Sequence, residues 1–138
     1  MSKKRILFVD DDLALLDLFM KYLTLKGFSV DVASRGEEAI EKAKESKFDL
    51  LILDIKLPDM LGDRVLREIR SVDEDIEVVM ITGYPNLQDT IDLLSFRIHE
   101  ILLKPVTTDE LLRVACEALT GSPVDSSDDN CQVVIQEP

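Results

Sequence analysis

The sequence predicts an α/β protein with a single doubly wound parallel sheet of five strands. Short runs that are apolar at nearly every position alternate along the chain with segments whose apolar residues recur at helical spacing. Continuous apolar runs are typical of strands buried on both faces. Alternation of such strands with helices indicates a parallel sheet covered by helices on both sides. The chain has 138 residues, 46% of them hydrophobic and 32% charged, so it can form one domain with a sizeable core.

The clearest strand is the apolar run 50–53, which is too short for a helix and is closed by Asp54. Residues 30–32 alternate between apolar and polar, which indicates a half-buried strand near an edge of the sheet. The remaining strands are short runs rich in Val, Ile and Leu. In order, the expected strands are residues 5–9, 30–32, 50–54, 78–81 and 101–103.

Each intervening helix is expected from its apolar spacing, and several have terminal signals. Gly27 is a stop signal for the first helix, and Gly121 follows the last one. Ser34 with Glu37 predicts a capping box for the second helix, which reaches about residue 45. Thr107 caps the last helix in the same way, with Glu110 as its partner. The helices are therefore expected around residues 16–23, 37–45, 65–69, 87–94 and 107–119.

The formal net charge is −12, which disfavours direct nucleic-acid binding because phosphate backbones attract basic surfaces. No stretch approaches the length of a membrane span, and the basic start at residues 3–5 lacks the cleavage site of a signal peptide. We therefore expect a cytoplasmic protein that does not bind membranes. Residues 1–120 are expected to form the domain, and the acidic residues 121–138 a disordered tail or a truncated linker.

Polar side chains follow four of the five expected strands. In a parallel sheet the carboxyl ends of the strands share one edge, which is where ligands bind. Carboxylates crowded there repel each other unless a cation lies among them, and oxygen-only ligands favour magnesium. A lysine and a hydroxyl beside a carboxylate nucleophile would neutralise a phosphoryl group. The residues at this edge are Asp10, Asp11, Asp54, Thr82 and Lys104, whereas Asp12 is expected to cap the first helix.

These positions belong to motifs that resemble the receiver domain of two-component response regulators, the CheY-like family. The resemblance spans roughly residues 4–120, and its motifs occur in the family's order. It implies a flavodoxin-like sandwich with strand order 2-1-3-4-5. The motifs are the run from Ile6 to Asp11, Leu53-Asp54 with Pro58 and Gly62, Ile81-Thr82-Gly83, and Lys104-Pro105.

By this resemblance, Asp54 is the phosphoacceptor and takes a phosphoryl group from a sensor histidine kinase or a histidine phosphotransfer protein. Asp10, Asp11, Asp54 and the main-chain carbonyl of Lys56 would hold Mg²⁺, for which Mn²⁺ can substitute. The phosphorylated domain would act as a signalling switch that changes its contacts with an unidentified downstream protein, as a monomer or as a phosphorylation-linked dimer. It would not be an enzyme, beyond promoting its own phosphoryl transfer and slow autodephosphorylation.

The same resemblance gives Thr82 and Lys104 their roles: Thr82 moves onto the phosphoryl group and Lys104 pairs with it. It also implies a cis peptide bond before Pro105. The chain departs from the family at Ile101, where Tyr or Phe is usual. A β-branched side chain is stiff at its first torsion and lacks a polar tip, so we expect the signal to travel mainly through backbone shifts after Thr82. Lys56 and Tyr84 lie where family members tune the phosphoryl lifetime, and Tyr84 could screen the acyl phosphate from water.

Two other functions use similar residues. An aspartyl-phosphate phosphohydrolase requires an acid two residues after the nucleophile, where this chain has Lys56. A phosphate-independent pseudo-receiver would bind its partner constitutively, but such domains tend to lose site residues that are kept here. A phosphorylation-dependent switch is therefore the leading hypothesis.

Overall fold

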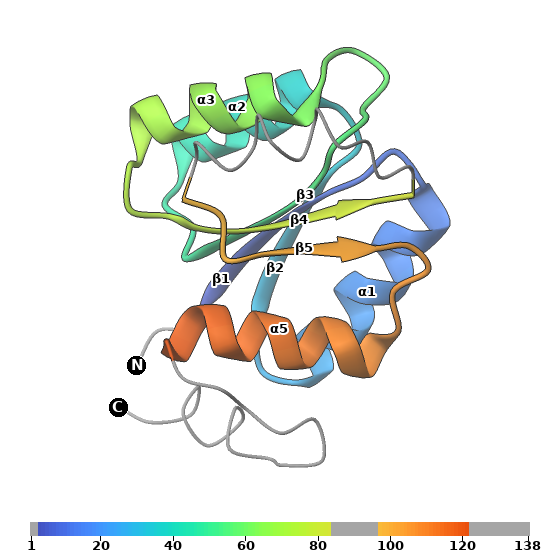
Figure 1. Ribbon diagram of the computed structural model, residues 1–138. Coiled ribbons are helices and arrows are strands. Elements are labelled where there is room, and N and C mark those ends of the chain that lie inside the picture. Colours follow the sequence, from blue (N-terminus) through green and yellow to red (C-terminus); the bar gives the residue numbers. More distant parts are fainter. Residues whose placement is uncertain (1–2, 84–96, 122–138) are drawn as a thin grey trace.

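The computed structural model describes residues 3–83 and 97–121 of the chain. Five parallel strands form one sheet in the order β2-β1-β3-β4-β5, which confirms the expected topology. The strands are β1 (Arg5–Val9), β2 (Ser29–Ala33), β3 (Leu50–Asp54), β4 (Glu77–Thr82) and β5 (Glu100–Leu103). The helices of the described ranges are α1 (Leu13–Leu25), α2 (Gly36–Glu45), α3 (Gly62–Val72) and α5 (Thr108–Thr120), labelled as in Figure 1.

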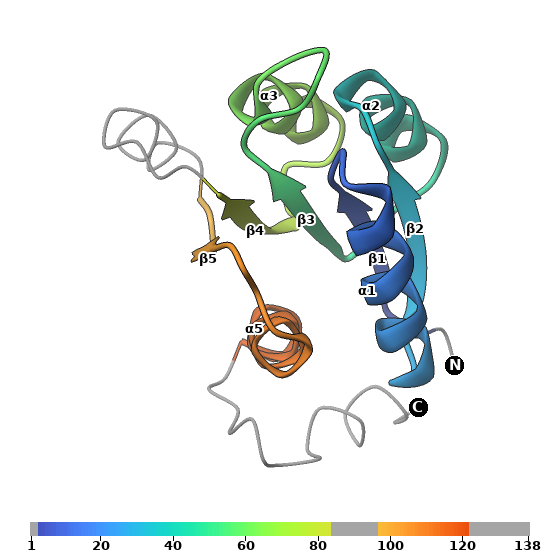
Figure 2. The same cartoon turned by 90° about the vertical axis from the view of Figure 1, so that its right-hand side faces the viewer.

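The helices lie in two layers on opposite faces of the sheet (Figures 1 and 2), α1 and α5 on one face and α2 and α3 on the other. Each layer encloses its own apolar core. On the α1/α5 face the rings of Phe8 and Phe19 pack with their centroids 5.6 Å apart. On the α2/α3 face Leu53, Val65 and Leu66 are completely buried. Side chains alternate between the two faces of a strand, which is why β3 is buried at every position.

The helix ends follow local sequence signals at α1 and α5. The Asp12 carboxylate accepts a hydrogen bond from the Leu15 N–H at 3.2 Å, and the Thr107 hydroxyl accepts one from Glu110 at 3.0 Å. Both caps were expected from the sequence. Gly121 ends α5 with a φ of 73°, a left-handed conformation that glycine adopts without a Cβ clash.

The capping box predicted for α2 is wrong. The helix begins at Gly36, and its N-cap residue Arg35 makes no side-chain capping bond. The Ser34 N–H instead donates to Glu38 at 2.9 Å. The start of the helix is capped by Asp59, a residue distant in the sequence, which local spacing cannot reveal.

The helix expected around residues 87–94, the residue Tyr84 and the tail after residue 121 fall outside the described residues. Within the described ranges, each helix is too short or too polar to cross a membrane.

Candidate functional site

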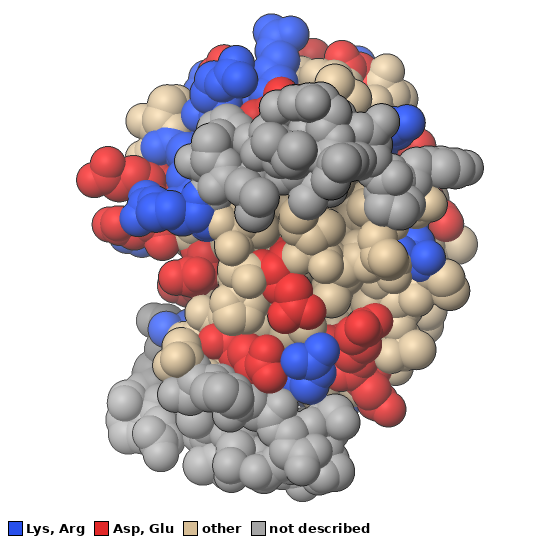
Figure 3. Space-filling model, viewed as in Figure 1, with Lys and Arg blue, Asp and Glu red and all other residues tan. Residues whose placement is uncertain are grey.

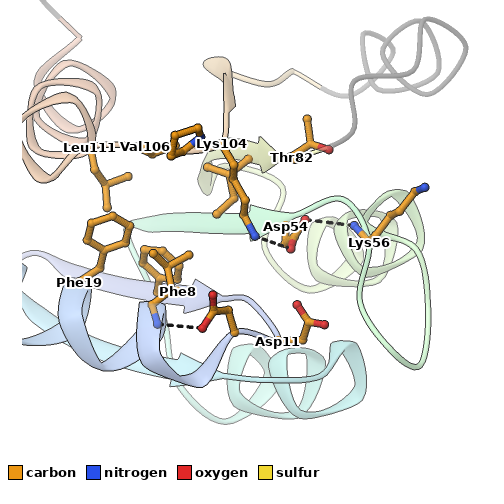
Figure 4. A pocket seen from close by; sticks show the side chains of 14 residues that line it. Phe8, Asp11, Phe19, Asp54, Lys56, Thr82, Lys104, Val106 and Leu111 are labelled. Carbon is orange, nitrogen blue, oxygen red and sulfur yellow. Dashed lines mark hydrogen bonds and ion pairs between the residues drawn. The ribbon is translucent and has the colours of Figure 1, made fainter.

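The carboxyl ends of β1, β3, β4 and β5 bring four polar side chains to one edge of the sheet. Asp10 follows β1 and is completely buried, and Asp54 and Thr82 end β3 and β4 with 6% and 2% of their surface exposed. Lys104 follows β5 and points into the same space, as Figure 4 shows. The parallel register produces this convergence, because Val9 lies beside Leu53 and Asp54 beside Ile81.

The Lys104 ammonium contacts two carboxylates. Its nitrogen lies 2.8 Å from Oδ2 of Asp10 and 3.1 Å from Oδ2 of Asp54. The other oxygen of Asp10 accepts a hydrogen bond from the Asp12 N–H at 2.9 Å, and Oδ1 of Asp54 accepts one from the Lys56 N–H at 3.2 Å. Both acceptor atoms of each carboxylate are thus directed by the protein toward fixed partners.

These contacts shift the pKa values of the pair in the same direction for different reasons. Burial raises the pKa of Asp10 above its ordinary value of 3.8, and the charge of Asp54 adds to this, although Lys104 and the Asp12 N–H oppose it. Burial alone would lower the pKa of Lys104, but hydrogen bonds and charge from Asp10 and Asp54 hold it above 10.5. Lys104 is therefore cationic at neutral pH, whereas burial makes the ionised form of Asp10 energetically unfavourable.

Asp10, Asp11 and Asp54 form a possible metal site. Each offers a carboxylate oxygen, and the three oxygens lie within 4.8 Å of one another. Oδ2 of the buried Asp10 already faces one positive charge, the Lys104 ammonium, and makes no other hydrogen bond among the described residues, so its environment suits a cationic partner. An all-oxygen set with one exposed member fits Mg²⁺, which keeps several waters when bound to proteins. Asp12, by contrast, has its carboxylate at the N-terminus of α1.

A cavity of about 610 Å³ opens over Asp11, Asp54 and Lys104, whereas Asp10 lies buried and is not part of its lining. Figure 4 shows its two ends: the polar one holds Lys104 and the groups around Asp54, and the apolar one reaches between α1 and α5. A cavity of this size has room for a phosphoryl group together with the hydrated cation that would accompany it. Its labelled residues are Asp11, Asp54, Lys56, Thr82 and Lys104 at the polar end and Phe8, Phe19, Val106 and Leu111 at the apolar end.

Of the residues expected to transmit or tune a signal, Lys56, Thr82, Lys104 and Pro105 line this cavity. Thr82 and Lys104 are tied through the backbone, since the Lys104 N–H donates to the Thr82 carbonyl at 2.8 Å. The Lys104–Pro105 peptide bond is cis, as expected. Ile101 is half-buried and packs against the core on the α2/α3 face. Tyr84 lies outside the described residues.

Sequence reasoning missed one part of the site, the fixing of the loop after β3. Gly62 begins α3 so close to β3 that a Cβ atom there would lie 2.8 Å from the Asp54 carbonyl oxygen and 2.9 Å from the Ile55 Cα. Gly62 was identified only as part of the family motif. The structure adds the physical reason, which is its close approach to the backbone at the end of β3. Asp59 caps α2 from this loop, and no local pattern marks it.

A second group of potential metal ligands, His99, Glu100 and Glu117, lies where β5 begins, beside α5. Glu117 already contacts Arg113 through both carboxylate oxygens, at 3.1 and 3.2 Å, and this positive charge disfavours a cation there. Figure 3 shows that acidic side chains lie over β5 and α5, whereas Lys and Arg side chains gather near α3.

The strand order and the polar groups at the carboxyl edge define an α/β domain of the flavodoxin-like class with a polar site at its sheet edge. The family model described as "Response regulator receiver domain" matches residues 6–115. The chain therefore belongs to the response regulator receiver domain family of two-component systems. Receiver domains are signalling switches and generally not enzymes.

Known structures and relatives agree with this assignment. A CheY-like receiver domain protein from Methanospirillum hungatei JF-1 is 35% identical with a TM-score of 0.85, and the match covers 87% of this chain and 96% of that one. The receiver domain of a putative Luxo repressor from Vibrio parahaemolyticus is 26% identical with a TM-score of 0.80, over 99% of this chain and 100% of that one.

Among curated proteins, the transcriptional regulatory protein ZraR of Klebsiella oxytoca is 32% identical over 122 residues, 88% of this chain and 28% of ZraR. The response regulator MprA of Mycobacterium leprae is 33% identical over 108 residues, 78% of this chain and 47% of MprA. The chain therefore spans less than half the length of these two relatives.

Proposed function

We propose that the protein is a phosphorylation-controlled switch in which Asp54 accepts a phosphoryl group from a phosphohistidine. A carboxylate oxygen of Asp54 would attack phosphorus as the bond from phosphorus to the histidine nitrogen breaks, and that nitrogen leaves with the electron pair. The observation that carries the proposal is the position of Asp54: it is held by a buried strand, paired with Lys104, and faces the open cavity.

Asp10, Asp11, Asp54 and the Lys56 carbonyl are the residues proposed to hold Mg²⁺, with Mn²⁺ as a substitute. The cation would offset the negative charge that three carboxylates and a phosphoryl group bring together. The Lys56 N–H bond to Asp54 keeps this residue beside the nucleophile, which supports the assignment of its carbonyl.

After transfer, the Asp54 oxygen that now faces Lys104 would carry phosphorus, and the ammonium would pair with the phosphoryl oxygens instead. The Thr82 hydroxyl would donate to the same group. Since the backbones of Thr82 and Lys104 are hydrogen-bonded, a shift of either residue moves both strand ends. This hydrogen bond supports the proposal that the conformational change is transmitted through the backbone after Thr82, while Ile101 stays packed against the core and does not rotate.

The partners proposed are a sensor histidine kinase or a histidine phosphotransfer protein upstream and an unidentified protein downstream, in the cytoplasm and without direct contact with nucleic acid. We propose residues 1–120 as the receiver unit. A phosphohydrolase is less well supported, because Lys56 occupies the position where that class requires an acid. A pseudo-receiver predicts the same fold without phosphoryl transfer, and the experiment below separates the two.

The test is the intact mass of the protein after incubation with acetyl phosphate. We expect a phosphoryl adduct with Mg²⁺, none with a chelator, and none for Asp54→Asn. Asp31→Asn is the matched control, since Asp31 is an exposed acid on β2, and it should form the adduct normally. A folded protein that binds Mg²⁺ but forms no adduct, either with acetyl phosphate or with a panel of phosphorylated histidine kinases, would favour the pseudo-receiver.

A further inference from the structure

The loop between β3 and α3 is attached to the start of α2 by one carboxylate. Oδ1 of Asp59 accepts a hydrogen bond from the Gly36 N–H at 2.8 Å, and Oδ2 accepts one from the Glu37 N–H at 2.9 Å. Each oxygen thus has its own backbone donor, and the two bonds fix the orientation of the carboxylate. The contact joins segments more than twenty residues apart.

The helix needs this contact because it has no cap of its own. The N-cap residue Arg35 has an extended backbone, with φ −141° and ψ 154°, and no side-chain capping bond. The first N–H groups of a helix have no partner within the helix and carry partial positive charge. Burial alone would raise the pKa of Asp59, but the N–H groups of Glu37 and Gly36 and the charge of Arg35 keep it below its ordinary value. Asp59 is therefore an anion at neutral pH.

An apolar contact reinforces the attachment. A Cβ atom on Gly36 would lie 2.5 Å from Cγ and 2.7 Å from Sδ of Met60. The first turn of α2 and the tip of the loop are therefore packed together without space for a further methyl group. Asp59 and Met60 are neighbours in the chain, so the polar and apolar contacts hold the same part of the loop.

The other end of this loop reaches the site. Lys56 forms an antiparallel bridge with Leu61, and the Leu57 N–H donates to the Met60 carbonyl at 3.3 Å. These contacts connect the tip of the loop to Lys56, whose N–H donates to Asp54. The loop is thus held between the nucleophile on one side and α2 on the other.

We propose that Asp59 is a positioning residue for the site: by capping α2 it holds the loop so that the Lys56 carbonyl faces the cation. This inference rests on the proposed function, since it concerns the same Mg²⁺ site. Asp59 itself contacts neither the cation nor the phosphoryl group and acts through the loop. Supporting residues of this kind typically change metal affinity by roughly 10–100-fold when they are mutated.

The experiment measures Mg²⁺ affinity by titration calorimetry on the full chain, under conditions in which every variant is folded. Asp59→Ala should bind Mg²⁺ about tenfold more weakly than the natural protein. Asp59→Asn, which keeps one carbonyl oxygen as an acceptor, should recover part of the loss. Ile76→Val is the control for general destabilisation, because Ile76 is a buried residue just before β4, at the opposite edge of the sheet, and should leave Mg²⁺ affinity unchanged.

Hydrogen exchange gives a second measurement that does not depend on the cation. The amide of Lys56 should exchange faster in Asp59→Ala than in Ile76→Val, after correction for global stability. If Asp59→Ala binds Mg²⁺ and protects the Lys56 amide as Ile76→Val does, the positioning role is wrong while the proposed function stands. If the natural protein itself fails to bind Mg²⁺, the proposed cation site is wrong, and the positioning role falls with it.

Discussion

The Lys104 ammonium lies 2.8 Å from the buried Asp10 carboxylate, although the two residues follow the first and last strands in the sequence. Asp54 shares the same ammonium at 3.1 Å. One cation thus stabilises two carboxylates that would otherwise repel each other. This arrangement makes the stability of the protein dependent on the charges at its site, and this dependence can be measured.

Lys104→Met should destabilise the protein at neutral pH. Removing one partner of a buried ion pair costs about 3–5 kcal/mol, and because the Lys104 side chain is 25% exposed, we expect about 2 kcal/mol from urea unfolding. Because the pKa of Lys104 is raised above 10.5, its contribution is complete below pH 10.5 and is lost as pH rises through the higher folded-state value. Saturating Mg²⁺ should reduce the difference at neutral pH, and an equal difference with and without Mg²⁺ would contradict a shared site.

Asp10→Asn should have the opposite effect in the absence of metal. Because burial raises the pKa of Asp10, the native state binds more protons than the unfolded state between 3.8 and the folded-state value. Stability is therefore lost as pH rises from 3.8 through the folded-state value. Because the Asn side chain is neutral at every pH, we expect the variant to be more stable than the natural protein at neutral pH and the gain to shrink toward pH 4. In addition, Mg²⁺ should no longer stabilise the protein, and a gain independent of pH would argue against the charge as its cause.

Gly62→Ala should destabilise the protein, because the added methyl group meets the backbone of Asp54 and Ile55, which cannot move aside easily. We expect a loss of about 1–3 kcal/mol in unfolding free energy. Gly83→Ala is the matched control, since among the described residues its methyl group would meet only the Lys104 side chain, at 3.8 Å. Similar stability of the two variants in urea would show that the close approach at Gly62 is not needed.

Asp12→Ala should lose about 1 kcal/mol of stability because α1 loses its cap. Asp12→Asn should be nearly as stable as the natural protein, since Asn is an equally good cap. If Asp12 only caps the helix, Asp12→Asn should also keep its Mg²⁺ affinity. A large fall in affinity for Asp12→Asn would make Asp12 part of the cation site.

Tyr84→Ala should shorten the lifetime of phosphorylated Asp54, because the natural side chain would shield the acyl phosphate from water. The measurement is the decay of the phosphoryl adduct by intact mass after the phosphodonor is removed. Tyr22→Ala is the control, since Tyr22 lies on α1 near Asp109 and away from the cavity. Equal decay in Tyr84→Ala and the natural protein would remove Tyr84 from the tuning residues.

The strand ends could be predicted because their signals are local. An apolar run followed by an acid marks β3 and Asp54, and the parallel arrangement then places Asp10, Thr82 and Lys104 beside it. The caps at Asp12 and Thr107 were equally local, since each bond spans three residues. These parts of the fold and site follow from periodicity, cap chemistry and the rule that parallel strands share an edge.

The contacts that hold the loop after β3 could not be predicted in this way. Asp59 reaches a helix that begins more than twenty residues earlier, and the closeness of Gly62 to β3 depends on how the chain returns after the strand. Ser34 and Glu37 matched a capping box, yet the carboxylate of Asp59, from another segment, accepts the hydrogen bonds at the helix start. Contacts between distant segments depend on tertiary packing, which a pattern in one window cannot contain.

The Asp10–Lys104 pair has a further consequence for how the protein matures. β1 and β5 are separated in the sheet by β3 and β4, so the pair forms only after four strands have aligned. An intermediate in which β5 has not yet joined would lack both the ammonium and the final geometry of the carboxylates. A cation that binds only the complete site shifts the equilibrium from such intermediates toward the native state by mass action. Cellular magnesium would then favour completion of the sheet as well as the chemistry at its edge.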